Sequence, residues 1–399
     1  MKNDFVDLPS VYLNKNEERK ILSGLPWLYS NQVEMRGDTK TLPPGALVIF
    51  REKNGGSVAL GYFNRHQLIA GRILTLNTAE TLNAAFFAQR IKSALTCREW
   101  FFDEPYYRLV HAESDFLPGL IIDRFNDVVV VQPNTHGAET ILPLVVEALQ
   151  TTLTPKSIVI FRHQRSRKLE NLDVREPEII GEAITHLDVL ENGVAFKIEL
   201  QGAQKTGWFY DHRDNRKLMA ALSKGKTVID YFCYAGSFAL QCAKAGATKA
   251  IGIDQSETAI AAAKASAKLN QVEKTTEFTV ANVFEDIEKR IALQQRFDMV
   301  LLDPPAFVKS KKDLAAGLKG YQKLIARALL LVQPGGMLMI ASCSYHVSET
   351  DLQTALQKAL VASSRMGRIV KRLSFSACHP KHPALQEGEY LKGLLVEVI

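Results

Sequence analysis

The chain has 399 residues, of which 46% are hydrophobic and 23% charged, and it carries a net charge of +6 at pH 7. This length allows two or three domains that each bury a core, and the composition is that of a globular protein, which excludes a low-complexity or disordered class. The small positive excess is compatible with an acidic partner such as nucleic acid but does not require one.

The cysteines and the apolar stretches exclude further classes of protein. Five cysteines are odd in number, widely spaced and never arranged as Cys-x-x-Cys. We therefore expect neither a disulfide framework nor a metal site, and a reducing, cytoplasmic location. The N-terminus is polar and acidic, unlike an export signal. The most apolar region, residues 324–341, is interrupted by polar residues, proline and glycine, so no membrane association is expected.

Residues 1–78 have the pattern of a small β-rich module. Short apolar runs at 46–51, 57–63 and 68–74 are separated by turns rich in proline, asparagine and glycine. Strands at this spacing predict a small β-barrel. Cations and aromatic residues are interspersed along the module, as on an RNA-binding surface. Core aromatics with solvated charges are the more common explanation of such a composition.

Residues 79–200 mix helical and strand patterns and predict a middle α/β domain. Apolar residues recur at helical spacing over 81–102 and 138–152, and a short apolar run at 157–161 is typical of a strand. The region closes with alternating residues on both sides of Asn192-Gly193, the strongest short signal for a β-hairpin.

The densest basic run of the chain lies at residues 162–168. Its cations, Arg162, Arg165, Arg167 and Lys168, have two explanations. They form a solvated loop, or they contact the phosphates of a nucleic acid. The residues of this run do not decide between the two.

Residues 201–399 alternate short apolar strands with helices, which predicts a mostly parallel sheet with helices on both faces. The unit at 227–254 reads as strand, turn, helix and a second strand ending in Asp254. Its turn, which follows Asp230, contains a single glycine, Gly236, where a dinucleotide site has Gly-x-Gly-x-x-Gly. The unit therefore suits a nucleoside without phosphates, of which S-adenosylmethionine is the commonest, with Asp254 on the ribose. An ordinary α/β crossover with a surface aspartate is the alternative.

Two further strand ends carry polar residues at the edge where open α/β sheets bind their ligands. Asn282 follows the third predicted strand and can hydrogen-bond adenine. Asp303 follows the fourth and is succeeded by two prolines, which fix a rigid turn. Such a turn would hold Asp303 near a methyl donor and offer a wall on which a flat base stacks. A merely stiff loop is the alternative.

Cys343 ends the fifth predicted strand, between two serines, beside the same crevice. The C5 atom of a pyrimidine is not nucleophilic by itself. Addition of a thiolate at C6 makes an enamine whose C5 attacks a methyl sulfonium, so we interpret Cys343 as a covalent nucleophile. A buried core cysteine is the alternative, and we accept it for Cys97, Cys242 and Cys378.

The motifs at 205–216 (Lys-Thr-Gly-Trp-Phe-Tyr-Asp-His-Arg-Asp-Asn-Arg), 303–307 (Asp-Pro-Pro-Ala-Phe), 342–344 (Ser-Cys-Ser) and 387–393 (Glu-Gly-Glu-Tyr-Leu-Lys-Gly) resemble a known family. The chain looks like the bacterial 23S rRNA cytosine-5 methyltransferases of the RlmI-like (YccW) family, over nearly its whole length. The resemblance implies a PUA domain, a middle α/β domain and a Rossmann-like class I methyltransferase domain. We place them at 1–78, 79–200 and 201–399.

The resemblance also implies the roles of particular residues. Cys343 would be the nucleophile and Asp303 would lie between cofactor and base. Lys205, Asp230, Gly236, Asp254, Asn282 and Asp303 would bind S-adenosylmethionine. Large-subunit ribosomal RNA would be the partner, which favours phosphate contact by the basic run. The sequence leaves room for a homodimer.

The sequence departs from the family pattern at two positions. Asn282 stands where the family has an aspartate, and Ala306 follows the prolines where other RNA cytosine-5 methyltransferases have a second cysteine. Release of the product therefore cannot depend on a thiol there. Glu387 is our suggestion for the base that removes the C5 proton.

Two other functions stay open. A guanine-N7 rRNA methyltransferase of the RlmK type shares the Lys-Thr-Gly segment and the Asp-Pro-Pro turn but needs no thiol, so Cys343 discriminates. A non-catalytic PUA-containing RNA-binding protein is disfavoured by the intact Gly236, Asp254 and Asp303. The sequence does not identify the target nucleotide, nor which of Phe209, Phe307 and Tyr345 stacks on a flipped base.

Overall fold

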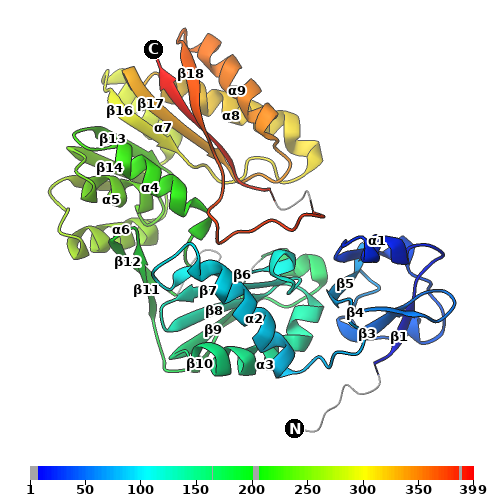
Figure 1. The fold of residues 1–399 in the computed structure, drawn as a ribbon. Helices are drawn as coiled ribbons and strands as arrows, with labels where there is room; N and C mark the ends of the chain where they lie inside the picture. Colours follow the sequence, from blue (N-terminus) through cyan, green and yellow to red (C-terminus); the bar gives the residue numbers. More distant parts are fainter. Residues whose placement is uncertain (1–7, 164, 201–205, 386–388) are drawn as a thin grey trace. The chain divides into compact units, whose positions relative to one another are not determined.

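The computed structural model describes residues 8–163, 165–200, 206–385 and 389–399 (Figure 1). Lys205 and Glu387, both predicted to be functional, lie outside the described residues. The chain divides into two compact units, Met1–Ile184 with Ala377–Gln386, and Thr185–Ser376 with Glu387–Ile399. In the part of the chain that the structure describes, no helix is long and apolar enough to cross a membrane.

The first unit begins with a small barrel, drawn in blue in Figure 1. Its sheet has the order β1-β3-β4-β5-β2. The strands are β1 (Ser10–Tyr12), β2 (Trp27–Tyr29), β3 (Ala46–Arg51), β4 (Ser57–Phe63) and β5 (Ile69–Thr75), accompanied by the helix α1 (Glu18–Leu22) and the 3-10 turns η1 (Ser30–Gln32) and η2 (Gly37–Lys40). A bridge between Leu13 and Val33 joins the two edges of this sheet, and Glu34 N donates to Tyr12 O at 2.8 Å. The edges are thus closed on each other, as predicted for this module.

A second sheet of the first unit has the order β10-β9-β8-β7-β6. Its elements are α2 (Ala84–Glu99), β6 (Tyr106–His111), η3 (Ala112–Asp115), β7 (Leu120–Phe125), β8 (Val128–Pro133), α3 (His136–Leu153), β9 (Ser157–Arg162), η4 (Arg165–Glu170) and β10 (Arg175–Gly181). The strands β8 and β9 pair in parallel, with α3 as the crossover, while the neighbouring pairs are antiparallel. The helices α2 and α3 pack against each other. This is the α/β arrangement predicted for the middle of the chain.

The sheet of the second unit has the order β15-β14-β13-β16-β17-β19-β18. Its strands are β13 (Thr227–Tyr231), β14 (Lys249–Asp254), β15 (Thr276–Val280), β16 (Phe297–Leu302), β17 (Val332–Ser342), β18 (Gly367–Leu373) and β19 (Lys392–Val398). All neighbours from β15 to β17 pair in parallel, whereas β19 runs antiparallel to both β17 and β18. The predicted mostly parallel sheet is therefore confirmed.

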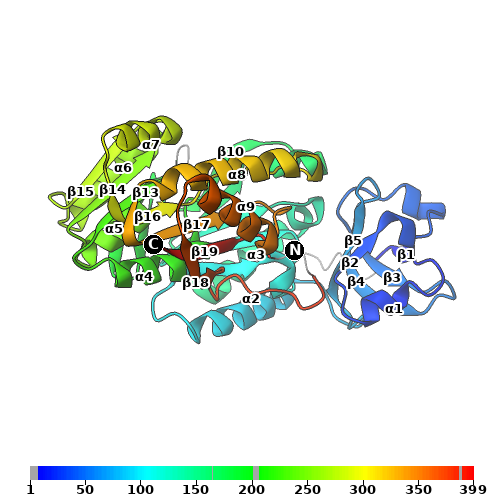
Figure 2. The same ribbon diagram turned by 90° about the horizontal axis from the view of Figure 1, so that it is seen from above.

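Helices cover both faces of this sheet (Figure 2). They are α4 (Arg213–Leu222), which follows η5 (Tyr210–His212), α5 (Ser237–Lys244), α6 (Glu257–Leu269), α7 (Val283–Ala292), α8 (Leu314–Leu329), which follows η6 (Lys311–Asp313), and α9 (Glu349–Ala362). The core under α7, α8 and α9 contains Ile229 and Tyr231 of β13. The alternate residue Asp230 accepts a hydrogen bond from Ala239 N of α5, so α5 lies on the opposite face.

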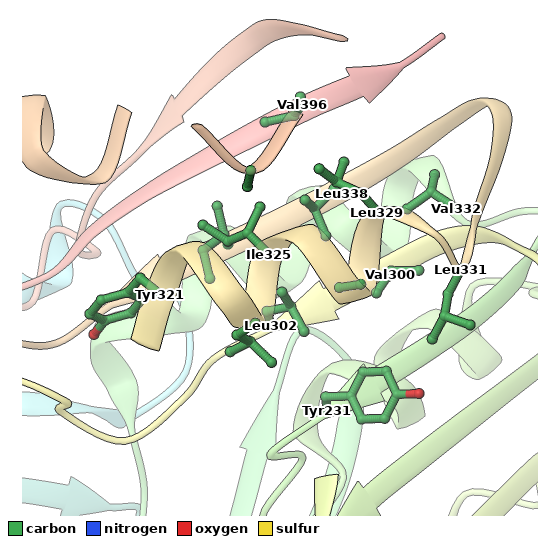
Figure 3. Packing of buried hydrophobic residues seen from close by; sticks show 14 of the residues in the cluster. Tyr231, Val300, Leu302, Tyr321, Ile325, Leu329, Leu331, Val332, Leu338 and Val396 are labelled. Atoms are coloured by element: carbon green, nitrogen blue, oxygen red, sulfur yellow. The ribbon is translucent and has the colours of Figure 1, made fainter. Parts of the chain in front are cut away.

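The helix α8 shows how this core is built (Figure 3). Its buried residues Tyr321, Ile325 and Leu329 recur every four positions and face the sheet. They pack with Val300, Leu302, Leu338 and Val396 in one apolar cluster. Each such side chain contributes about 1.5–3 kcal/mol when it leaves water. The parallel strands are thereby fixed in register, and their carboxyl ends meet at one edge.

A β-hairpin, β11 (His186–Glu191) and β12 (Val194–Glu199), opens the second unit. Its turn is the predicted Asn192-Gly193, with φ angles of 53° and 76°. Asn270, which follows α6, donates to Ala195 O and accepts from Ala195 N. Because the hairpin packs on α6 in this way, the compact units divide at 184/185, where the sequence led us to expect 200/201.

Candidate functional site

A cavity of about 460 Å³ lies at the carboxyl ends of the parallel strands in the second unit. Four of the predicted site residues line it together: Asp254, Asn282, Asp303 and Cys343. Asp254 ends β14, and the other three follow β15, β16 and β17, at the edge where open α/β sheets bind ligands. Phe209 and Phe307 also line the cavity, whereas Tyr345 does not, so it is not positioned to stack on a base there.

The turn after β13 has an unusual backbone. Phe232, Tyr234 and Gly236 have φ angles of 61°, 49° and 74°, alternating with residues of ordinary conformation. The left-handed region is costly for a bulky side chain, and such strain is concentrated at functional sites. Cys233 N donates to Ile253 O at 3.1 Å and Tyr234 N to the Asp254 carboxylate at 3.0 Å. These bonds hold the strained turn against the end of β14.

The carboxylate of Asp254 is fixed by two backbone hydrogen bonds. Its Oδ2 accepts from Tyr234 N at 3.0 Å and its Oδ1 from Ser256 N at 2.9 Å, which fixes the carboxylate at the mouth of the turn. Each carboxylate oxygen can accept a second hydrogen bond. The hydroxyls of a ribose are suitable donors for the remaining lone pairs.

Two predicted cofactor residues, Asp230 before the turn and Gly236 within it, do not line the cavity. Asp230 is 1% exposed, and its Oδ2 accepts from Ala239 N at 3.2 Å, holding the first turn of α5. Burial raises the pKa of Asp230 well above its usual value, and the charges of Asp303 and Asp254 add to the effect. A Cβ on Gly236 would meet the Phe278 ring at 2.6 Å, so this glycine allows close packing. Both residues support the turn that borders the cavity, and their contact with the cofactor stays a prediction.

Asn282 is the N-cap residue of α7 and lines the cavity. Its Oδ1 accepts from Phe284 N at 2.9 Å and from Glu285 N at 3.4 Å, the bonding of a helix N-cap. The amide nitrogen remains as a donor toward a ligand, which an aspartate at this position would lack.

Asp303 is held by a histidine that the sequence did not single out. His212 Nε2 lies 3.4 Å from Asp303 Oδ1, and both side chains line the cavity. The amide nitrogen of Asn215 lies 3.1 Å from His212 Nδ1 and donates to Ser374 O at 3.0 Å. Because that nitrogen is a donor, Nδ1 accepts and the proton of a neutral His212 is on Nε2, facing Asp303. His212 belongs to the 205–216 motif, and that membership was its only signal.

Cys343 is set between two loops. Its Sγ lies 4.0 Å from Pro304 O, next to Asp303. The hydroxyls of Ser342 and Ser344 lie 2.8 and 3.1 Å from Tyr321 Oη of α8. The two serines therefore anchor the cysteine loop to a buried tyrosine.

Trp208 and Arg216 of the 205–216 motif are anchored to one buried carboxylate, that of Glu191. Glu191 of the hairpin is 0% exposed and accepts from Arg216 Nε at 2.5 Å, from Trp208 Nε1 at 2.9 Å and from Gln241 Nε2 at 2.8 Å. Arg216 also donates to Phe209 O at 2.7 Å. A fully hydrogen-bonded network of this kind connects the hairpin, the motif, α4 and α5.

Two residues of the basic run at 162–168, Arg162 and Arg167, form internal ion pairs, which corrects our expectation for both. Arg162 pairs with Glu139 at 2.9 Å and with Glu178 at 2.6 Å. Arg167 is 2% exposed and pairs with Glu139 at 2.7 Å. Since these charges are neutralised and Arg167 is buried, neither is available to phosphates. Lys168 is exposed, and the side chain of Arg165 lies outside the described residues.

Comparison with known proteins identifies the family. A model of the S-adenosylmethionine-dependent methyltransferase family matches residues 143–395, and a model of the PUA-like domain matches residues 11–76. "Ribosomal RNA large subunit methyltransferase I" of Aeromonas hydrophila is 34% identical over 97% of this chain and 98% of its own. The protein of the same name from Tolumonas auensis is 33% identical over 98% and 99%.

Solved structures share the fold at low sequence identity. A candidate methyltransferase, SMU.776, complexed with SAH, has a TM-score of 0.81 at 19% identity and covers 98% of this chain and 100% of its own. A candidate SAM-dependent methyltransferase from Streptococcus mutans has a TM-score of 0.79 at 19% identity, with the same coverage. The chain thus belongs to the S-adenosylmethionine-dependent methyltransferase family, in the group of ribosomal RNA large subunit methyltransferase I, and S-adenosylmethionine is its cofactor.

Proposed function

We propose that the protein methylates C5 of a cytosine in 23S ribosomal RNA through a covalent adduct with Cys343. The observation that carries this proposal is that Cys343 lines the same cavity as Asp254, Asn282 and Asp303. A thiol in that position is needed for attack on a pyrimidine and is superfluous for methylation of guanine N7, which is already nucleophilic. The name of the curated relatives supports ribosomal RNA of the large subunit as substrate.

The residues around the cavity fit the cofactor. The carboxylate of Asp254 would accept from the ribose hydroxyls, and the amide of Asn282 would donate to the adenine ring. The strained turn at 232–236 brings backbone to the cavity without a phosphate cradle, which suits a nucleoside. When bound, S-adenosylmethionine supplies an electrophilic methyl group.

Cys343 forms and later breaks one bond to the base. The thiolate adds to C6, and the electron pair of the C5–C6 double bond moves to C5, which takes the methyl group. Loss of the proton from C5 then restores the double bond as the C6–S bond breaks, and the electron pair returns to sulfur. Glu387 stays our prediction for the acceptor of that proton, and Glu387→Gln would accumulate the covalent adduct.

Asp303 orients the base in this scheme. A carboxylate is the natural acceptor for the exocyclic amine of cytosine. His212 holds one oxygen of Asp303 from the protein side, which leaves the other for the substrate. The base must leave its stack to reach the cavity, at a cost of about a few kcal/mol, and the rings of Phe209 and Phe307 line its destination.

A mechanism-based trap tests the proposal. Large-subunit rRNA containing 5-fluorocytidine has no proton to lose at C5, so the adduct cannot resolve after methyl transfer. We expect a stable protein–RNA band on a denaturing gel with the wild type, none with Cys343→Ser, and an undiminished band with Cys97→Ser, whose cysteine is exposed elsewhere. Formation of 7-methylguanosine without any adduct would overturn the proposal.

A further inference from the structure

Lys392 is held at the end of β17, where the nucleophile lies, by its pairing in the sheet and by two backbone carbonyls. It is the first residue of β19 and pairs in register with Ser342, the residue before Cys343. Its Nζ donates to Ser344 O at 3.1 Å and to Glu389 O at 3.2 Å. Both acceptors are neutral carbonyls, so these bonds position the ammonium without neutralising its charge. The side chain is partly buried, which strengthens its electrostatic reach.

Among the titratable groups that interact with Lys392, the thiol of Cys343 has the strongest Coulombic effect on its pKa. Burial lowers the pKa of Lys392, and the interaction with Cys343 opposes that effect ahead of those with Glu389 and Asp351. Tyr321 of α8 also lies near Cys343, and burial raises the pKa of its phenol, so it stays neutral. The remaining titratable side chains of the cavity wall are the acids Asp211, Asp254 and Asp303, together with His212, Arg216, Cys233 and Tyr234.

Cys233 lines the same cavity in the opposite surroundings. It is 3% exposed. Burial raises the pKa of its thiol well above the usual value, and the charges of Asp230 and Asp254 raise it further. This cysteine is therefore kept as a neutral thiol, while Cys343 has a cation nearby. A positive charge next to a thiol favours the thiolate.

We propose that Lys392 is the positioning cation that keeps Cys343 as a thiolate, ready to attack C6 of the base. This inference rests on the proposed function, since it assigns a partner to the nucleophile of that reaction. The proton of the thiol leaves to solvent before the base enters, and Lys392 remains an ammonium throughout. When the C6–S bond breaks, the electron pair returns to sulfur beside the same cation, which also makes the thiolate a better leaving group.

Alkylation of the free protein tests this without RNA or cofactor. The rate at which iodoacetamide modifies Cys343 is measured by peptide mass spectrometry over a pH series, with exposed Cys97 as internal reference. Lys392→Met should move the pH midpoint for Cys343 upward by about one unit. Lys392→Arg should stay near the wild type, and so should Lys371→Met, which removes an exposed lysine from the adjacent strand β18.

The outcomes separate this inference from the proposed function. An unchanged midpoint in Lys392→Met would overturn the role of the lysine, even if Cys343 proves to be essential. A shifted midpoint together with full methylation by Cys343→Ala would support the electrostatic pairing and overturn the proposed chemistry. If Lys392→Met does not fold, as judged by thermal unfolding, Lys392→Gln is compared with Lys392→Arg. Equal midpoints in those two variants would contradict the proposal.

Discussion

At the scale of single residues, the turn after β13 differs most from what its sequence suggested. The sequence pointed to Gly236 as the residue that allows close approach, yet Phe232 and Tyr234 also adopt positive φ angles. Nothing in the side chains of phenylalanine and tyrosine favours that conformation, so it must be imposed by surrounding contacts. The bond from Tyr234 N to Asp254 is one of them, which couples the shape of the turn to the acid that we expect to bind the ribose.

Replacement of Asp254 tests its role toward the cofactor. Asp254→Asn keeps one oxygen for the backbone donors but loses the charge and an acceptor for the ribose. A hydrogen bond to a charged group contributes about 1.5–3 kcal/mol, so the Kd for S-adenosylhomocysteine in calorimetry should rise about 10- to 100-fold. Glu257→Gln, an exposed change in the first turn of α6, is the control and should bind normally. Equal affinity of the two variants would exclude Asp254 from the cofactor site.

The buried Asp230 makes stability depend on pH. Because burial raises the pKa of this carboxyl, the folded state favours its protonated form, and stability is lost as the pH rises from the unfolded value of about 3.9 through the raised value. Asp230→Asn cannot ionise and can still accept from Ala239 N. In denaturant unfolding it should be more stable than the wild type at neutral pH, with the difference vanishing toward about pH 4.

Asp298 provides a control of opposite sign for that experiment. Burial acts to raise the pKa of Asp298 but is outweighed by hydrogen bonds from Thr227 and by Lys226, so the pKa is lowered. Its charged form therefore stabilises the fold above the usual carboxyl pKa. Asp298→Asn should be less stable than the wild type at neutral pH. A stability gain for Asp298→Asn, or a loss for Asp230→Asn, would contradict this assignment of the two carboxyls.

At the scale of elements, the hairpin and the site share one buried network. Glu191→Ala would leave the guanidinium of Arg216, which is 1% exposed, without its counterion. Breaking a buried pair in this way costs about 3–5 kcal/mol, and the midpoint of urea unfolding should fall accordingly. Asp188→Ala on the same strand is the matched control, since its side chain is exposed. A similar small effect for both variants would show that the network does not stabilise this unit.

Much of this fold could be predicted from the sequence because its strands have clear signals. The hairpin at Asn192-Gly193 and the strands β13 to β17 follow local patterns of apolar residues and turns. The edge strand β18 was missed because most of its residues are exposed and it contains Arg368, Lys371 and Arg372. Its pairing with β19, and the packing of the hairpin on α6, depend on contacts that no local pattern contains.

The candidate site was predicted in part for the same reason. Asp254, Asn282, Asp303 and Cys343 end consecutive parallel strands, so sheet topology alone brings them together. The pairing of Arg162 and Arg167 with Glu139 could not be foreseen, because the acid lies on α3 and a charged residue looks the same in sequence whether paired or free. The same holds for His212 and Lys392, whose positions depend on tertiary contacts.

At the scale of the whole molecule, the PUA-like domain and the cavity belong to different compact units of the chain. The PUA-like domain lies in the first unit and the cavity in the second, and the chain returns to the first unit at Ala377–Gln386. The sequence predicted phosphate contact by the basic run, and Lys168 is the described residue for which that prediction stands.

Replacement of Lys168 tests that contact. Lys168→Gln removes an exposed cation and should lower the slope of log K for rRNA binding against log salt concentration by about one. Binding of S-adenosylhomocysteine should be unchanged, because Lys168 does not line the cavity. Lys156→Gln is the control, since that lysine is paired with Glu182 at 2.8 Å. An equal salt slope in the wild type and Lys168→Gln would exclude the contact.

The central claim is that Cys343 carries out cytosine-5 chemistry, and nucleoside mass spectrometry tests it most directly. Unmodified large-subunit rRNA is incubated with S-adenosylmethionine and the wild type, Cys343→Ala or Cys97→Ala, then digested to nucleosides. We predict 5-methylcytidine with the wild type and Cys97→Ala, and none with Cys343→Ala. Appearance of 7-methylguanosine, at the same level with Cys343→Ala, would contradict the account and make Cys343 a packing residue.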